Sequence, residues 1–200
     1  MHLRVTQLRG TVGALPEVVS LFPMLVCGIG GIVVVALANA DAVTLRLRLT
    51  TALVAAASAA LLDDTASVTL ASSPASLAVR RGFRVLIIGV SVGMWWSIAT
   101  AAAAVGMPHL PVAELGREAV VLTGVATVAA LAAQRWSIDG RGGSAGGVAA
   151  IGWFALSFLP RIHWVPLPPD PADPRSTGAL LVVAVVAACI AMLLSRDPAR

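Results

Sequence analysis

Long apolar stretches alternate with short polar segments along the whole chain. A helix needs roughly 17–25 mostly apolar residues to cross a membrane. Six stretches approach that length, over residues 18–40, 44–62, 84–105, 118–133, 145–159 and 178–195. This pattern predicts an all-α fold, a single transmembrane domain over residues 1–200 with about six membrane helices. The fourth and fifth stretches are short, and a five-span alternative, with one of them folded back as a re-entrant segment, stays open.

The distribution of arginine predicts which side of the membrane each polar segment occupies. The chain has no lysine, and nine of its fourteen basic residues fall on one side when the N-terminus is placed inside. Because positive residues favour the cytoplasmic side, both termini and the segment 63–83 are expected in the cytoplasm. The proline-rich segment 160–177 is then an outer loop. Arg46 and Arg48, at the outer start of the second stretch, are expected to reach phospholipid headgroups, or to attract an anionic lipid or substrate.

The composition is typical of a membrane protein and limits which partners and metal or disulfide sites can be expected. The chain is 58% hydrophobic and 12% charged, with a mean hydropathy of +0.90, whereas about 25% charged residues is usual in soluble domains. The net charge of +4 is spread over loops, which suits phospholipid headgroups as partners and gives no reason to expect nucleic acid. Cys27 and Cys189 stand alone in apolar stretches, so neither a metal site nor a disulfide is expected.

The middles of the apolar stretches hold essentially no ionisable residues. Carriers driven by protons or sodium ions usually place such residues there, because the ion must be bound. Enzymes that act within membranes need paired acids or metal ligands, which makes a lipid-processing enzyme the weakest alternative. Because lysine is absent, a Walker A loop is impossible and the chain cannot hydrolyse ATP itself. We therefore expect no catalytic residue and no cofactor in this chain.

The polar segment 63–83 contains the strongest candidates for functional residues. Thr65–Ser72 is long enough for two helical turns along the membrane surface, and Ser73-Pro74 is typical of the start of the next helix. Such a short helix between two spans would transmit force from a soluble partner. The alternative is a solvated loop whose arginines only anchor the lipid interface. The candidate coupling residues are Asp63, Asp64, Thr65, Ser67, Arg80, Arg81 and Arg84.

The same segment carries a resemblance. Leu-Asp-Asp-Thr-Ala at 62–66, then Ser73-Pro74, then Arg-Arg-Gly-Phe-Arg at 80–84 resembles the first cytoplasmic loop in small six-span membrane subunits (permeases) of bacterial ABC exporters. The resemblance implies a location in a bacterial inner membrane, a coupling helix at 65–72 and a separate ATP-binding subunit that holds ATP and Mg²⁺. It also implies a second membrane subunit, identical or homologous, and a hydrophobic or amphipathic substrate such as a lipid, drug or peptide. A non-catalytic accessory or scaffold subunit of a larger membrane complex is the alternative.

Two motifs in the third stretch complete the set of candidates. Trp95 and Trp96 lie about eleven residues into it, near the middle of the membrane, where they would line a substrate pathway or pack between helices with the ring N–H bonded to a neighbour. Gly89-Val-Ser-Val-Gly93 would let another helix approach closely at Gly89 and Gly93. The same letters imitate the nucleophile turn of serine hydrolases, but that turn joins a strand to a helix, a context that is missing here.

Overall fold

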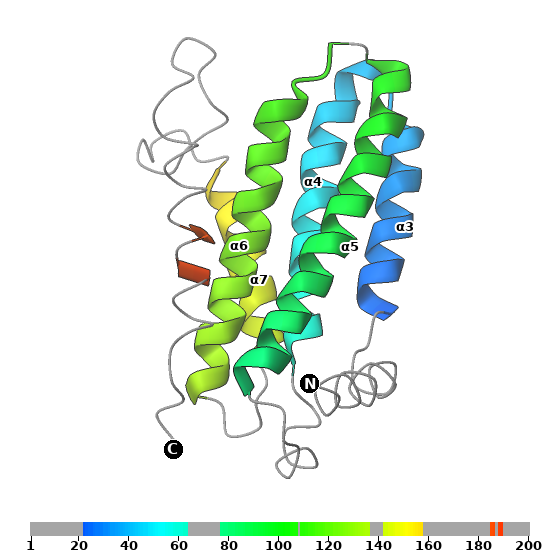
Figure 1. Cartoon of the computed structure of the whole chain (residues 1–200). Helices are drawn as coiled ribbons and strands as arrows, with labels where there is room; N and C mark the ends of the chain where they lie inside the picture. The colour runs from blue at the N-terminus through cyan, green and yellow to red at the C-terminus, as the bar shows by residue number, and fades with distance from the viewer. Residues whose placement is uncertain are drawn as a thin grey trace, which may run out of the picture.

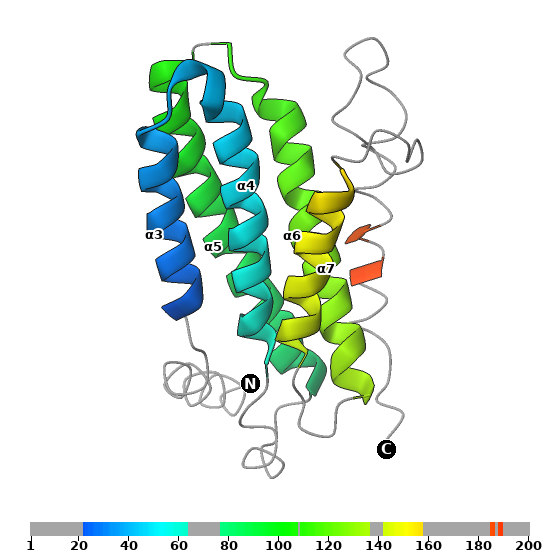
Figure 2. The ribbon, with the colours of Figure 1, turned by 180° about the vertical axis from the view of Figure 1, so that it is seen from behind.

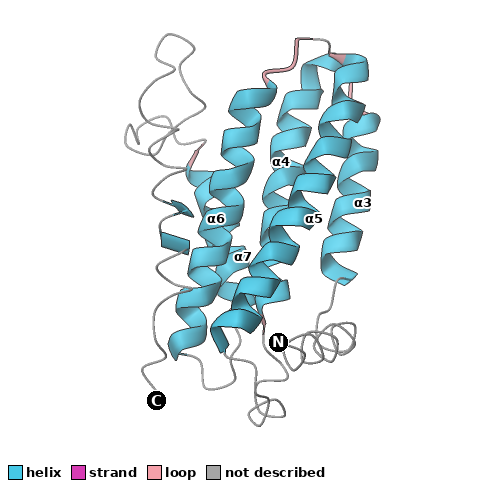
Figure 3. Cartoon of the chain, in the orientation of Figure 1, coloured by secondary structure: helices cyan, strands magenta, loops and turns pink. Residues whose placement is uncertain are grey.

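The computed structural model describes residues 22–63, 77–107, 109–136, 142–157, 185, 186, 188 and 189. Within these ranges the chain is helical and contains no strand, which confirms the all-α prediction (Figures 1 and 3). The elements in chain order are α3 (Phe22–Ala36), α4 (Ala40–Ala59), the 3-10 turn η1 (Ala60–Leu62), α5 (Leu77–Gly106), α6 (Val112–Trp136) and α7 (Gly143–Leu156).

Consecutive helices run up and down, with α4 at the centre of the bundle. In Figure 1 the upper end holds the turn between α3 and α4 and the connection from α5 to α6, and the shorter α7 ends below that level. The lower end holds η1, the start of α5, the end of α6 and the start of α7. Among the described helices, α4 packs against each of the other four, with α3 and α5 on one side and α6 and α7 on the other (Figure 2). Contact with α4 therefore helps to position each of these four helices.

Three of these helices are long and apolar enough to cross a membrane, namely 41–62, 81–105 and 112–136, while α3 and α7 are shorter apolar helices. Helix α6 extends well beyond the apolar stretch 118–133 expected from sequence, because Glu114, Arg117 and Arg135 lie in its outer turns and shorten the apolar run without interrupting the helix. Of the sixth stretch, 178–195, only four residues are described.

The bundle is apolar outside and partly polar inside. Large apolar side chains point outward from each helix, among them Phe22, Ile29, Leu45, Leu53, Val90, Met94, Val120, Val148 and Ile151. The buried polar side chains are Thr50, Thr51, Ser58, Arg84, Thr127, Gln134 and Ser157. Soluble proteins rarely expose so many large apolar side chains, whereas lipid covers them without cost. The chain is therefore a helical membrane protein.

Helix α7 approaches its neighbours through glycine. A Cβ added at Gly146 would lie 2.5 Å from the carbonyl oxygen of Ala126 and 2.7 Å from the Cβ of Ala59. One added at Gly143 would lie 2.8 Å from the Cα of Ala60. Helix α7 begins at Gly143, two residues before the apolar stretch 145–159 expected from sequence. These glycines bring α7 into backbone contact with α4 and α6, as small residues do in membrane bundles.

Candidate functional site

Asp63 joins the end of η1 to the start of α7 at the lower end of the bundle. Its Oδ1 accepts hydrogen bonds from the backbone N–H groups of Gly142 and Gly143, both at 2.6 Å. The first amides of a helix have no acceptor within the helix, and its N-terminus carries a partial positive charge. The carboxylate of Asp63 therefore caps α7 from a position about 80 residues earlier in the chain.

Two further side chains bind the backbone at the same point. The guanidinium of Arg84 on α5 donates from Nη1 to the carbonyl oxygens of Leu62 and Asp63, at 3.1 and 3.0 Å. Gln134 on α6 donates from Nε2 to the carbonyl oxygen of Leu62. Arg84 and Gln134 are each only 6% exposed. The carbonyl groups at the end of a helix lack partners within the helix, and here two neighbouring helices supply them. We call this contact set the lower junction.

The lower junction unites two of the residues that sequence reasoning singled out for coupling. Asp63 and Arg84 meet there through backbone groups, one at each end of the segment 63–83. Arg81, one turn before Arg84 on α5, is half-buried. The remaining coupling candidates, Asp64, Thr65, Ser67 and the side chain of Arg80, lie outside the described residues. The two ends of the polar segment are thus held together at the base of the bundle.

Trp95 lies between α3 and α5. Its indole Nε1 donates to the carbonyl oxygen of Gly28 at 2.9 Å, and the side chain is 5% exposed. A Cβ added at Gly28 or Gly31 would come within 3.2 or 3.4 Å of the indole ring, so the two glycines make room for it. Trp96 is half-buried, with its ring centroid 6.3 Å from that of Trp95. Trp95 therefore packs between helices with its ring N–H bonded, and a pathway role for Trp95 and Trp96 stays a prediction.

Gly89 and Gly93 lie on the outward face of α5. A Cβ added at either position would meet no atom within 4 Å, and the neighbouring Val90 and Met94 are both 63% exposed. Within the described part of this chain, no helix packs on these glycines. Close approach of a helix from another subunit at this face stays a prediction.

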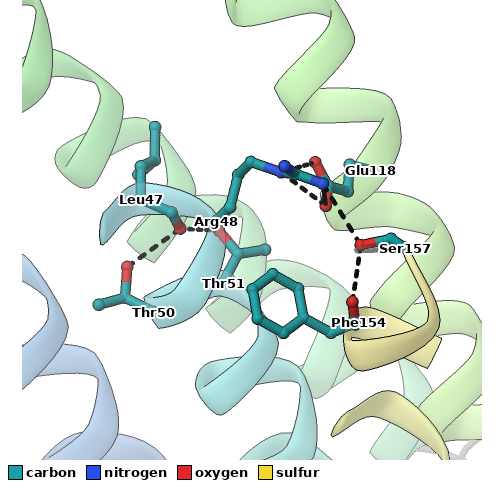
Figure 4. A network of polar contacts seen from close by, with 7 residues as sticks. All are labelled: Leu47, Arg48, Thr50, Thr51, Glu118, Phe154 and Ser157. Atoms are coloured by element: carbon teal, nitrogen blue, oxygen red, sulfur yellow. Dashed lines mark hydrogen bonds and ion pairs between the residues drawn. The ribbon is translucent and has the colours of Figure 1, made fainter. Parts of the chain in front are cut away.

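A charged cluster near the upper end was not anticipated from the sequence (Figure 4). Arg48 on α4 forms a two-point ion pair with Glu118 on α6: Nε lies 2.8 Å from Oε2, and Nη2 lies 2.9 Å from Oε1. Nη2 also lies 3.5 Å from the hydroxyl of Ser157, which donates to the carbonyl oxygen of Phe154 at 2.6 Å. The cluster connects α4, α6 and the end of α7. The sequence did contain one indication of this pair: Arg48 and Glu118 have opposite charges and lie at similar expected depths in the second and fourth apolar stretches.

Arg46 has a different partner from Arg48. Its Nη1 donates to the carbonyl oxygens of Val34 and Leu37, at 3.4 and 3.2 Å. Val34 lies in the last turn of α3 and Leu37 directly follows that helix, so Arg46 binds carbonyl groups at the end of α3 much as Arg84 does at the end of η1. Both arginines at the start of α4 thus bind protein groups, where sequence reasoning expected lipid headgroups or an anionic ligand.

Among the described residues, no group of three or more His, Cys, Asp or Glu side chains is placed to hold a metal ion. Comparisons with protein-family models, curated proteins and solved structures yield no match to this chain.

Proposed function

We propose that the chain is the transmembrane subunit of an ABC exporter, driven by a separate ATP-binding subunit that docks on segment 63–83. The chain itself has no catalytic role; ATP and Mg²⁺ are held by the partner. A second membrane subunit, identical or homologous, completes the pathway. The substrate is hydrophobic or amphipathic, of the class of lipids, drugs and peptides.

The lower junction is the observation that carries this proposal. Four elements converge on Leu62 and Asp63: η1 itself, α5 through Arg84, α6 through Gln134, and α7 through its first amides. Leu62 and Asp63 also lie at the start of segment 63–83. A displacement of that segment by a docked partner would therefore reach all four elements at once. Such a connection is what a subunit needs when its helices are rocked by a separate motor protein.

The proposed placement has six spans and both termini in the cytoplasm of a bacterial cell, with the lower end of the bundle inside. The alternating direction of α3 to α7 supports this arrangement (Figure 1). It places Arg81, Arg84 and Arg135 at the inner surface, as the preference of positive residues for that side requires.

The first experiment is gentle solubilisation of the tagged full-length chain from its own cells, with mass spectrometry of the proteins that accompany it. We expect a stoichiometric soluble protein with a Walker A motif, lost when residues 65–72 are replaced by a Gly-Ser linker of equal length. Recovery with membrane proteins alone would contradict the exporter proposal.

Two matched arginine substitutions test coupling within the recovered complex. Arg84→Gln and Arg46→Gln each remove a guanidinium that binds two carbonyl groups at a helix end, but only Arg84 lies at the root of segment 63–83. We expect both complexes to retain the ATPase. In nanodiscs, only Arg84→Gln should reduce ATP hydrolysis to the rate of the isolated ATP-binding subunit. Equal rates in both variants would contradict a coupling role for the lower junction.

The second candidate function is an accessory or scaffold subunit of a larger membrane complex. The outward face of α5 favours it, because Leu86, Val90, Met94 and Ile98 are all at least 47% exposed around the open positions of Gly89 and Gly93. Recovery of the chain with membrane proteins alone, lost on Gly89→Leu with Gly93→Leu, would establish this function in place of the exporter.

A further inference from the structure

The Arg48–Glu118 pair holds the upper half of the bundle together (Figure 4). It lies roughly 10 Å below the upper ends of α4 and α6, by the rise of 1.5 Å per residue. The two side chains are 13% and 23% exposed. In this position each charge is largely removed from water, and the other is its main compensation. Helices α4 and α6 cannot separate at this level without breaking the pair.

Below the pair, the contact between α4 and its neighbours α6 and α7 has a different chemistry. The hydroxyl groups of Thr51 and Ser58 on α4 donate to carbonyl oxygens of α4 itself. Those of Thr123 and Thr127 on α6 likewise donate within α6. Among the described residues, the hydrogen bonds from α4 and η1 to α6 and α7 therefore gather at the two ends, at the Arg48 cluster above and the lower junction below.

The two ends differ in how readily they can open. The lower junction is built from backbone groups at helix ends, each of which needs a partner at all times. The upper cluster is built from two long charged side chains near the membrane surface, where water can solvate each charge once the helices part. Between them, small residues such as Gly146, Ala59 and Ala126 bring α7, α4 and α6 into van der Waals contact, and such contact can be remade after small shifts of one helix along another.

We propose that Arg48, Glu118 and Ser157 form a latch that keeps the upper side of the bundle closed, and that its release opens a path between α4 and the α6–α7 pair. This inference deepens the proposed function and rests on it: an exporter must open to the outer side in one of its states, and in the structure the Arg48 cluster joins α4 to α6 and α7 near that side. The lower junction keeps the lower ends of these helices together while the upper ends separate.

Cysteine accessibility tests the latch without any ATPase. The background is the full chain with Cys27→Ala and Cys189→Ala, so that one introduced cysteine is the reporter. Thr51→Cys reports on the upper contact, since Thr51 is 3% exposed, one turn below Arg48. Thr127→Cys, at 4% exposed, reports on the lower half. Both are treated with a sulfonated maleimide in broken membranes, where the reagent reaches both faces.

With the latch intact we expect slow labelling at both reporters. Glu118→Gln and Arg48→Gln should each raise the labelling rate of Thr51→Cys at least tenfold and leave that of Thr127→Cys unchanged. Exchanging the charges, with Arg48→Glu and Glu118→Arg together, should return the Thr51→Cys rate to within about threefold of the background, because the opposite charges meet again.

Two results would overturn the latch. One is a Thr51→Cys rate within twofold of the background in both single variants, which would mean that the pair does not hold the contact closed. The other is an equal rise at Thr127→Cys, which would mean that the pair supports the whole fold and is not a local gate. The labelling experiment involves no ATP-binding subunit. The latch can therefore be supported even when no ATPase is recovered with the chain, and it can be refuted even when an ATPase is recovered.

Discussion

The contact of α7 with α4 and α6 at Gly146 provides the sharpest test of the fold. A methyl group at this position would lie 2.5 Å from the carbonyl oxygen of Ala126, 2.7 Å from the Cβ of Ala59 and 2.9 Å from the Cβ of Ala130. Carbon atoms in contact prefer about 3.5–4.0 Å. Gly146→Ala therefore requires α7 to move away from both neighbours by roughly 1 Å, since the atoms it meets are backbone or Cβ atoms that cannot rotate aside.

A matched control exists on the same helix. A Cβ added at Gly152 would meet no atom within 4 Å, so Gly152→Ala adds a methyl group in open space. Both substitutions gain the same helix propensity, about 0.5–1 kcal/mol relative to glycine, and this contribution cancels when the two variants are compared. The difference between them isolates the overlap, for which we expect about 1–3 kcal/mol of lost stability in Gly146→Ala.

The measurement is reversible unfolding of each purified variant in mixed micelles with increasing sodium dodecyl sulfate, followed by far-ultraviolet circular dichroism. We expect Gly152→Ala to unfold at or above the detergent fraction of the unsubstituted protein, and Gly146→Ala clearly below it. If the two variants had free energies of unfolding within about 0.5 kcal/mol of each other, a difference that surface substitutions also produce, the close approach of α7 at Gly146 would be refuted.

Two further substitutions test individual hydrogen bonds. Asp63→Ala removes the acceptor for the first amides of α7 and should cost about 0.5–2 kcal/mol of stability. The loss should appear as faster hydrogen exchange in the first turn of α7, and Asp63→Asn, which keeps one acceptor oxygen, should change that exchange much less. Unchanged exchange in Asp63→Ala would exclude the cap. Trp95→Phe removes the donor to Gly28 and should lower the free energy of unfolding by about 0.5–1.5 kcal/mol through the lost hydrogen bond alone. This loss should exceed the loss caused by Trp96→Phe. The reverse order in detergent unfolding would argue against the placement of the Trp95 indole.

The apolar pattern determined the class of protein because the membrane imposes a simple rule. A segment that crosses lipid must satisfy every backbone hydrogen bond within itself, and a long apolar stretch does so as a helix. For this reason the all-α fold and the approximate positions of α4 and α5 could be read directly from hydropathy. The rule fails at helix ends, where polar residues are tolerated near the surface, and α6 is accordingly longer than the stretch 118–133 predicts.

The tertiary structure alone decided which distant residues meet. Arg48 and Glu118 are 70 residues apart in the chain, and Asp63 binds the amide of Gly142 across 79 residues. Hydropathy gives the depth of such residues in the membrane but not the direction in which each helix face points. It also does not show that Gly143 and Gly146 serve as close contacts between helices. Glycine serves equally in a flexible loop and in a close helix contact, and only the arrival of α4 and α6 at van der Waals distance distinguishes the two.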